Sequence, residues 1–173
     1  MWSCGSNGNG QLGLGHTSDR EVFVRLHAIG SVVMAACGSH HSVVATAEGR
    51  VWTWGCGYDG RLGHADDQDM KLLPALVGGS CDPAEHFHRA KIAMVAAGGF
   101  HTVAVEEGGN GMWVWGGGAY GQLGLGDRKD KFLPTRLEAA DAFQQTGNIQ
   151  MASCGRLHTL TVTKQVCTMY VYH

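Results

Sequence analysis

Two short motifs recur three times each along this chain, in the same alternating order. The first ends in Gly-[Gln/Arg]-Leu-Gly and occurs at residues 4–13, 54–63 and 115–124. The second reads Gly-x-x-His-[Ser/Thr] and occurs at residues 38–42, 98–102 and 155–159. Equivalent positions are 50 to 61 residues apart. Repeats of this length predict a propeller or a solenoid, in which each unit buries its apolar face only against its neighbours.

Short apolar runs between the motifs indicate β-strands, because runs of this length bounded by Gly and Asn are typical of strands. They cover residues 31–37, 42–46, 51–54, 91–97, 102–105, 112–115, 148–153 and 159–162. A further strand should follow each Gly-Leu-Gly, around residues 22–26, 72–77 and 132–137. Pro74 and Pro134 place this strand at the outer edge of its sheet, since proline cannot donate to a strand ladder. Four antiparallel strands per repeat predict an all-β fold of propeller blades.

The paired motifs resemble the repeats of the regulator of chromosome condensation family. The fullest copy combines Trp115–Gly124 with Cys154–Thr159, and the resemblance covers nearly the whole chain. It implies a seven-bladed β-propeller of four-stranded blades, with the sequence repeat offset from the blade. Some positions depart from the family pattern: Cys4 replaces an aromatic residue and Ala97 replaces a cysteine.

We expect one domain, residues 1–173, with repeats at approximately 1–50, 51–111 and 112–173. A seven-bladed ring needs about seven such units. The chain therefore predicts a partial propeller, or one part of an assembled ring whose further blades come from the same or another chain. Residues 169–173 align with the strand at 51–55. We favour a fragment, because an open stack of blades exposes two apolar edges.

The repeat-equivalent residues are interpreted as structural. Glycines at fixed positions mark backbone with positive φ or a close approach of two chains. The histidines, one per blade, are expected to bond the backbone near their own glycine turns, and the tryptophans to pack in the core. These structural positions are Gly5, Gly55, Gly116, Gly38, Gly98, Gly155, His41, His101, His158, Trp54 and Trp115. Cys37 and Cys154 are equivalent too, and we interpret them as small buried hydrophobes.

Composition argues against several classes of function. A formal net charge of −2 and a pI near 6.5 argue against a nucleic-acid partner, because binding nucleic acid needs a basic patch. No apolar stretch reaches the roughly 18 residues of a membrane helix, and no signal peptide is visible. The six cysteines form no C-x-x-C pair. We expect no catalytic residue, no cofactor and no metal site, and a reducing, intracellular compartment, cytoplasmic or nuclear.

The least repeat-like segment, residues 78–89, is the candidate partner-binding loop, since insertions in repeat proteins map to loops on one face. Its candidate residues are His86, Phe87, His88 and Arg89, with Phe87 as the aromatic anchor. A tolerated loop without a partner is the equal alternative. Charged loop tips at 66–71 and 127–131 are further contact candidates.

These features predict a non-catalytic protein–protein interaction scaffold and not an enzyme, because no nucleophile–base pair or carboxylate pair emerges. The resemblance implies two alternatives. One is guanine-nucleotide exchange on a small Ran-type GTPase, for which residues 78–89 are the only candidate wedge. Asp82 and Glu85 are its only acids, which is thin support. The other is a propeller module of a larger ubiquitin ligase or signalling protein.

Overall fold

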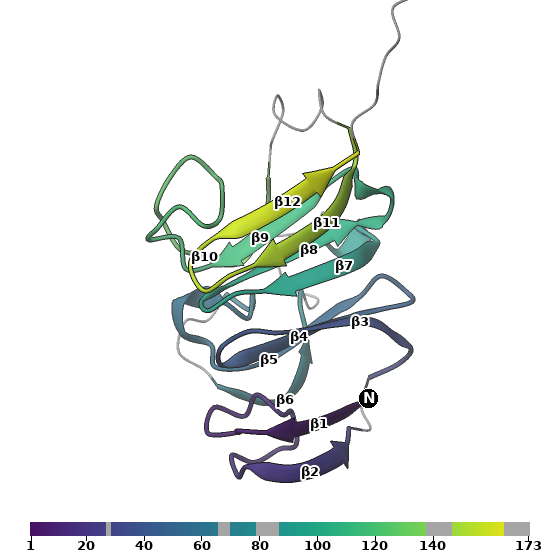
Figure 1. Cartoon of the computed structure of the whole chain (residues 1–173), viewed down its shortest axis with the longest axis vertical. Coiled ribbons are helices and arrows are strands. Elements are labelled where there is room, and N and C mark those ends of the chain that lie inside the picture. Colours follow the sequence, from purple (N-terminus) through teal and green to yellow (C-terminus); the bar gives the residue numbers. More distant parts are fainter. Residues whose placement is uncertain (27–28, 66–69, 79–86, 138–146, 165–173) are drawn as a thin grey trace, which may run out of the picture.

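Four antiparallel sheets stack on one another in chain order, from the N-terminal pair of strands to the C-terminal pair (Figure 1). The computed structural model describes residues 1–26, 29–65, 70–78, 87–137 and 147–164. Within these ranges the regular elements are strands and three short 3₁₀ helices. The predicted all-β fold is therefore confirmed.

Two sheets are complete four-stranded blades, each in simple sequential order. The first blade consists of β3 (Val32–Cys37), β4 (His41–Thr46), β5 (Val51–Gly55) and β6 (Lys71–Leu76). The second consists of β7 (Ile92–Ala97), β8 (His101–Glu106), β9 (Met112–Gly116) and β10 (Lys131–Arg136). Pro74 and Pro134 lie in β6 and β10, the edge strands, as predicted.

The two outer sheets each hold two described strands. One pairs β1 (Trp2–Gly5) with β2 (Arg20–Arg25), and the other pairs β11 (Ile149–Cys154) with β12 (Thr159–Thr163). The 3₁₀ helices are η1 (Tyr58–Gly60), η2 (Phe87–Arg89) and η3 (Glu107–Gly109). The strand predicted at residues 169–173 lies outside the described part of the chain.

Strands β4 and β9 are buried along their whole length, because both faces of each blade pack against neighbouring blades. One core cluster joins Val43 and Val51 of the first blade to Val95 and Trp115 of the second. A second cluster joins the second blade to β11 through Val103 and Ala152, among others. The core thus lies between blades, as expected for a repeat that cannot bury its apolar face alone.

The strand register gathers the loops at one edge of the stack. His41 lies opposite Gly55, and His101 lies opposite Gly116. The turn that enters β4 and the loop that leaves β5 therefore meet at the same edge, and the same holds for β8 and β9. We call this edge, on the left of Figure 1, the rim.

Close chain approach explains the glycines at two rim positions. Gly55 has φ of +104°, and a methyl group there would lie 2.5 Å from the carbonyl oxygen of His40. At Gly38 such a methyl group would overlap the imidazole of His41. Any larger residue would force the turn away from the neighbouring strand.

Candidate functional site

We call the contact between two neighbouring sheets a seam, and number the three seams from the N-terminus. A buried hydrogen-bond network joins the two complete blades at the second seam. The Nε2 atom of His41 lies 2.9 Å from the Oγ1 atom of Thr102, on the next blade. The Thr102 hydroxyl donates to the carbonyl of Arg61 at 2.8 Å. The indole N–H of Trp115 donates to the same carbonyl at 3.0 Å. These groups are almost wholly buried, so the network ties one blade to the other without solvent competition.

The network determines the tautomer of His41. A threonine hydroxyl carries one hydrogen, and Thr102 gives it to the Arg61 carbonyl, so Nε2 of His41 must be the donor to Thr102. The Nδ1 atom is then a bare acceptor, without a hydrogen-bond partner among the described residues. Burial, with the nearby Arg61 charge, lowers the pKa of His41 to about 3. His41 is therefore neutral at physiological pH.

Parts of the same arrangement recur at the seams on either side, the hydroxyl and indole at the first and the histidine and hydroxyl at the third. At the first seam, the Ser42 hydroxyl and the Trp54 indole both donate to the carbonyl of Gln11, at 2.7 and 2.8 Å. At the third, His101 bonds Thr159 at 2.9 Å, and Thr159 donates to the carbonyl of Gln122 at 2.7 Å.

The predicted histidine partner is therefore wrong. His41 and His101 bond a hydroxyl on the following blade, and not the backbone of their own glycine turns. Burial, with the neighbouring His158, lowers the pKa of His101 to about 4. The side chain of His158 itself is exposed. Neutral imidazoles held in this way are structural links between blades, and the described residues contain no group of three or more His, Cys, Asp or Glu that could hold a metal.

The prediction of buried cysteines is only partly right. Cys37 is exposed, whereas Cys154 is half-buried. Burial raises the pKa of the Cys154 thiol to about 11, against the opposing effect of the Thr159 hydroxyl. A thiol with so high a pKa is a poor nucleophile at neutral pH.

The rim residues next to this network differ from repeat to repeat. Asn9, Asp59 and Tyr120 are equivalent in the first motif, and His40, Phe100 and Leu157 are equivalent in the second; all six are at least partly exposed. Pairs from adjacent blades meet at the rim. Asn9 Nδ2 lies 3.4 Å from His40 Nδ1. A hydroxyl that donates to the equivalent main-chain carbonyl thus recurs at all three seams, while the rim residues change with every blade.

The Arg61 side chain links several rim segments at the second seam. It replaces the glutamine found at the equivalent positions in the other copies, Gln11 and Gln122. Its buried guanidinium donates to Asp59 at 2.6 Å and to the carbonyl of Gly99 at 3.1 Å, and it lies 4.9 Å from the centre of the Phe100 ring. A buried charge needs such partners, because an unpaired one would be costly.

A cavity of about 260 Å³ opens at the rim between the second and third seams. Phe100, Tyr120 and Leu157 form its apolar walls, and Arg156 and Asp130 supply charges of both signs. The exposed guanidinium of Arg156 lies 5.8 Å from the Phe100 ring centre, and the Tyr120 side chain is 69% exposed. Aromatic and arginine side chains are enriched in protein–protein interfaces.

The structure differs from the prediction for the partner-binding loop. Phe87, its expected anchor, is buried in the core, where its ring makes edge-to-face contacts with Trp113 and Trp115 at 5.2 and 5.7 Å. Its role as an exposed anchor is therefore wrong. His88 and Arg89 are exposed, and His86 lies outside the described residues. Alternation of apolar and polar residues could not reveal that the insertion returns to the core at Phe87.

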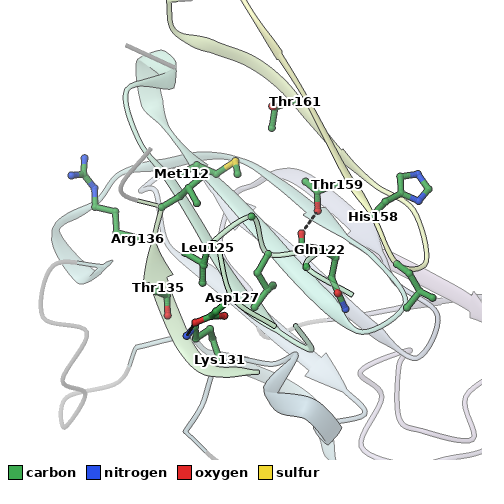
Figure 2. Close-up of a pocket in the computed structure, with 15 residues that line it drawn as sticks. Met112, Gln122, Leu125, Asp127, Lys131, Thr135, Arg136, His158, Thr159 and Thr161 are labelled. Atoms are coloured by element: carbon green, nitrogen blue, oxygen red, sulfur yellow. Dashed lines mark hydrogen bonds and ion pairs between the residues drawn. The ribbon is translucent and has the colours of Figure 1, made fainter. Parts of the chain in front are cut away.

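A larger cavity, of about 760 Å³, lies beside the third seam (Figure 2). Gln122 and Thr159, joined by their hydrogen bond, form one side, and Met112, Leu125 and Leu137 contribute apolar surface. No helix in the described ranges is long and apolar enough to cross a membrane.

Stacked four-stranded antiparallel blades that bury their core between neighbours define the chain as part of a β-propeller. Residues 1–45, 48–105 and 110–162 each match the regulator of chromosome condensation (RCC1) repeat. The chain belongs to the RCC1 repeat family, which confirms the resemblance found in its motifs.

Curated relatives cover nearly all of this chain. It is 37% identical over 167 residues to the ultraviolet-B receptor UVR8 of Arabidopsis thaliana, a match that covers 93% of the chain and 34% of UVR8. It is 36% identical over 171 residues to the human E3 ubiquitin-protein ligase HERC2, which covers 94% of the chain and 3% of HERC2. The chain thus spans about a third of the first relative and a small part of the second.

Solved structures support the same fold. Human WBSCR16 superposes with a TM-score of 0.75 at 27% identity, over 94% of this chain and 39% of that one. Prp20p of Saccharomyces cerevisiae, whose structure was described together with its binding to Gsp1p and histones, gives a TM-score of 0.76 at 23% identity. That match covers 96% of this chain and 40% of Prp20p.

Proposed function

We propose that the chain is a non-catalytic protein-binding scaffold, and that its rim is the binding surface. The observation that carries this proposal is the contrast between seam and rim. The seam uses His, Ser or Thr and Trp at equivalent positions, because those residues hold blades together. The six exposed or partly exposed rim positions are outside that network, and they carry a different polar, aromatic or aliphatic residue in each repeat.

The rim has the chemistry of a protein interface. Phe100 and Tyr120 supply aromatic surface, and Arg156 supplies an exposed cation beside the Phe100 ring. Interface hot spots are enriched in Tyr and Arg. The supporting framework is rigid, because the loops are tied to buried strands through the register at His41 and His101.

The relatives favour the alternative that the chain is a module of a larger protein over the alternative that it is a guanine-nucleotide exchange factor. HERC2 and UVR8 contain similar stretches as a small or moderate share of their length. For nucleotide exchange, the candidate wedge was the segment ending at Arg89, and its one described aromatic residue, Phe87, is buried. No described feature favours the exchange function over simple partner binding.

The test is binding by the purified chain after a partner has been recovered and identified by crosslinking and mass spectrometry. The double variant Tyr120→Ala/Arg156→Ala alters only exposed rim side chains. We expect it to lose at least about tenfold in affinity, as for interface residues that contribute above 1.4 kcal/mol. The control Leu73→Ala removes an apolar side chain of β6 that is 58% exposed, against 69% for Tyr120. Equal binding by wild type and the rim variant would contradict the proposal.

A further inference from the structure

The second seam already holds a guanidinium group at the rim. Arg61 Nε donates to the carbonyl of Tyr58 at 2.7 Å, and its Nη atoms donate to Asp59 at 2.6 Å and to the carbonyl of Gly99 at 3.1 Å. The Phe100 ring centre lies 4.9 Å from Cζ of the same side chain. The space between a loop of the first motif and the next turn of the second motif thus accommodates a guanidinium.

The equivalent space at the third seam lacks this side chain. Gln122 stands at the position of Arg61, and its Oε1 accepts instead from the backbone N–H of Tyr120 at 2.9 Å. The rim cavity of about 260 Å³ lies here, and Gln122 lines it. It is also lined by the equivalents of the four residues that contact the Arg61 guanidinium. These equivalents of Tyr58, Asp59, Gly99 and Phe100 are, respectively, Ala119, Tyr120, Arg156 and Leu157.

The first seam shows the same glutamine geometry with its side chains in contact across the rim. The Oε1 atom of Gln11 accepts from the backbone N–H of Asn9 at 2.9 Å. Asn9 and His40, the equivalents of Tyr120 and Leu157, approach to 3.4 Å. The first seam is therefore a natural control for changes made at the third.

Two charged groups of opposite sign line the third-seam cavity without an ion pair. Asp130 accepts from the backbone N–H of Gly118 through Oδ1 at 2.7 Å, and its second oxygen has no donor among the described residues. The Arg156 guanidinium lies 5.8 Å from the Phe100 ring centre and forms no ion pair within the described part of the chain. A ligand with a cation and an anion side by side complements both groups.

Size and shape favour arginine as the source of the cation. A cavity of about 260 Å³ is smaller than the roughly 300–1,000 Å³ of most small-molecule sites, so it suits a single side chain. The Tyr120 ring beside it is 69% exposed. A planar guanidinium stacks on an aromatic ring and donates a fork of hydrogen bonds to a carboxylate, whereas a lysine ammonium is a strongly hydrated point charge.

We propose that the third-seam cavity receives an arginine side chain of the partner protein, and that an acidic residue next to this arginine pairs with Arg156. The partner's guanidinium stacks on Tyr120 and donates to the free oxygen of Asp130. It fills the place at the third seam that Arg61 fills at the second. This inference rests on the proposed function, because it names the chemistry that the partner presents to the rim.

NMR titration of the ¹⁵N-labelled chain with capped tetrapeptides tests the proposal. The probe is acetyl-Gly-Arg-Glu-Gly-amide, and the amide resonances of Tyr120 and Leu157 report on the cavity. We expect saturable shifts there, and at least about tenfold weaker binding when uncharged citrulline replaces arginine, because hydrogen bonds from a charged donor are the stronger ones. The proposal would be overturned by equal binding of the citrulline peptide, by equal binding of acetyl-Gly-Gln-Glu-Gly-amide, or by the lack of saturable shifts.

A matched pair of substitutions tests where the arginine binds. Gln122→Arg supplies the chain's own guanidinium to the cavity, as Arg61 does at the second seam, and should weaken peptide binding at least about tenfold. Gln11→Arg makes the same change at the first seam and should leave binding unchanged. Equal peptide affinity of these two variants would place the arginine outside this cavity.

Two further variants test the charges. Asp130→Asn keeps an oxygen acceptor for the Gly118 N–H and removes the negative charge, so it should weaken binding of the arginine peptide. Arg156→Gln should abolish the preference for Glu over Gln beside the arginine. Unchanged affinity in Asp130→Asn, or an unchanged preference in Arg156→Gln, would contradict the assigned contacts.

The recovered partner distinguishes this inference from the proposed function. Gln122→Arg leaves the side chains of Tyr120 and Arg156 in place, and we expect it to lose the partner as Tyr120→Ala/Arg156→Ala does. If the double variant lost the partner and Gln122→Arg kept it, the rim would remain the binding surface and the arginine proposal alone would fail. If both variants bound the partner as the wild type does, the proposed function itself would fail.

Discussion

Replacing Thr102 with valine tests the seam network most sharply, because the side chains have similar shape and only the hydroxyl is lost. The hydroxyl accepts from His41 Nε2 at 2.9 Å and donates to the Arg61 carbonyl at 2.8 Å. Trp115 continues to bond that carbonyl, at 3.0 Å. The main damage is therefore to the buried N–H of His41, which is left without an acceptor.

The expected loss follows from these contacts. A buried donor left unsatisfied costs about 1–3 kcal/mol, and the lost bond to the Arg61 carbonyl costs about 1 kcal/mol. Thr102→Val should thus lower the free energy of unfolding by about 2–4 kcal/mol. Urea denaturation followed by tryptophan fluorescence measures it, since Trp54 and Trp115 lie in the seams.

Ser42 provides the matched control. It occupies the equivalent position and donates to the Gln11 carbonyl at 2.7 Å, but no described histidine donates to it. Ser42→Ala should therefore cost only about 1 kcal/mol. Thr102→Ser keeps the hydroxyl and should recover most of the loss. If Thr102→Val proved no more destabilising than Ser42→Ala, the assignment of His41 as a donor to Thr102 would be refuted.

Three further predictions concern single residues. Burial lowers the pKa of His41 to about 3 and that of His101 to about 4, so the unfolded chain binds these protons first as the pH falls. Stability should be flat above pH 6.5 and fall below it, by about 2 kcal/mol from each histidine between pH 7.5 and 5, as urea titrations of the wild type and of a His41→Gln variant at several pH values would show. Arg61→Gln restores the residue of the other two repeats and should be tolerated, whereas Asp59→Ala leaves the buried guanidinium without its carboxylate and should lower the Tm more. Phe87→Ala should cost about 3–5 kcal/mol in chemical denaturation, against less than about 0.5 kcal/mol for Arg89→Ala on the same 3₁₀ helix.

Periodicity made most of the fold accessible from the sequence. Strand alternation, glycine turns and the prolines of β6 and β10 are local signals, and they recur in each repeat. Strand bounds differ from the predicted ones by one or two residues, as at β2, which begins at Arg20. The offset of repeat and blade also follows from the family resemblance.

The contacts across seams could not be predicted from local sequence patterns. His41 and Thr102 are 61 residues apart, so only the stacking of blades brings them together. The histidine was predicted to be structural, but its partner was wrong because the acceptor belongs to the next blade. Phe87 was missed for the same reason, since Trp113 and Trp115 become its neighbours only when the insertion returns to the core. A comparison of the three repeats would have identified the rim, because its exposed positions differ where the seam positions agree.

Hydrogen–deuterium exchange of the chain, with and without its recovered partner, tests the central claim most directly. The account predicts slower exchange on binding in the rim segments 39–41, 58–61, 99–101, 119–121 and 156–158. The outer strands β6 and β10 should exchange at unchanged rates. Protection confined to those outer strands, with the rim unchanged, would contradict the assignment of the rim as the binding surface.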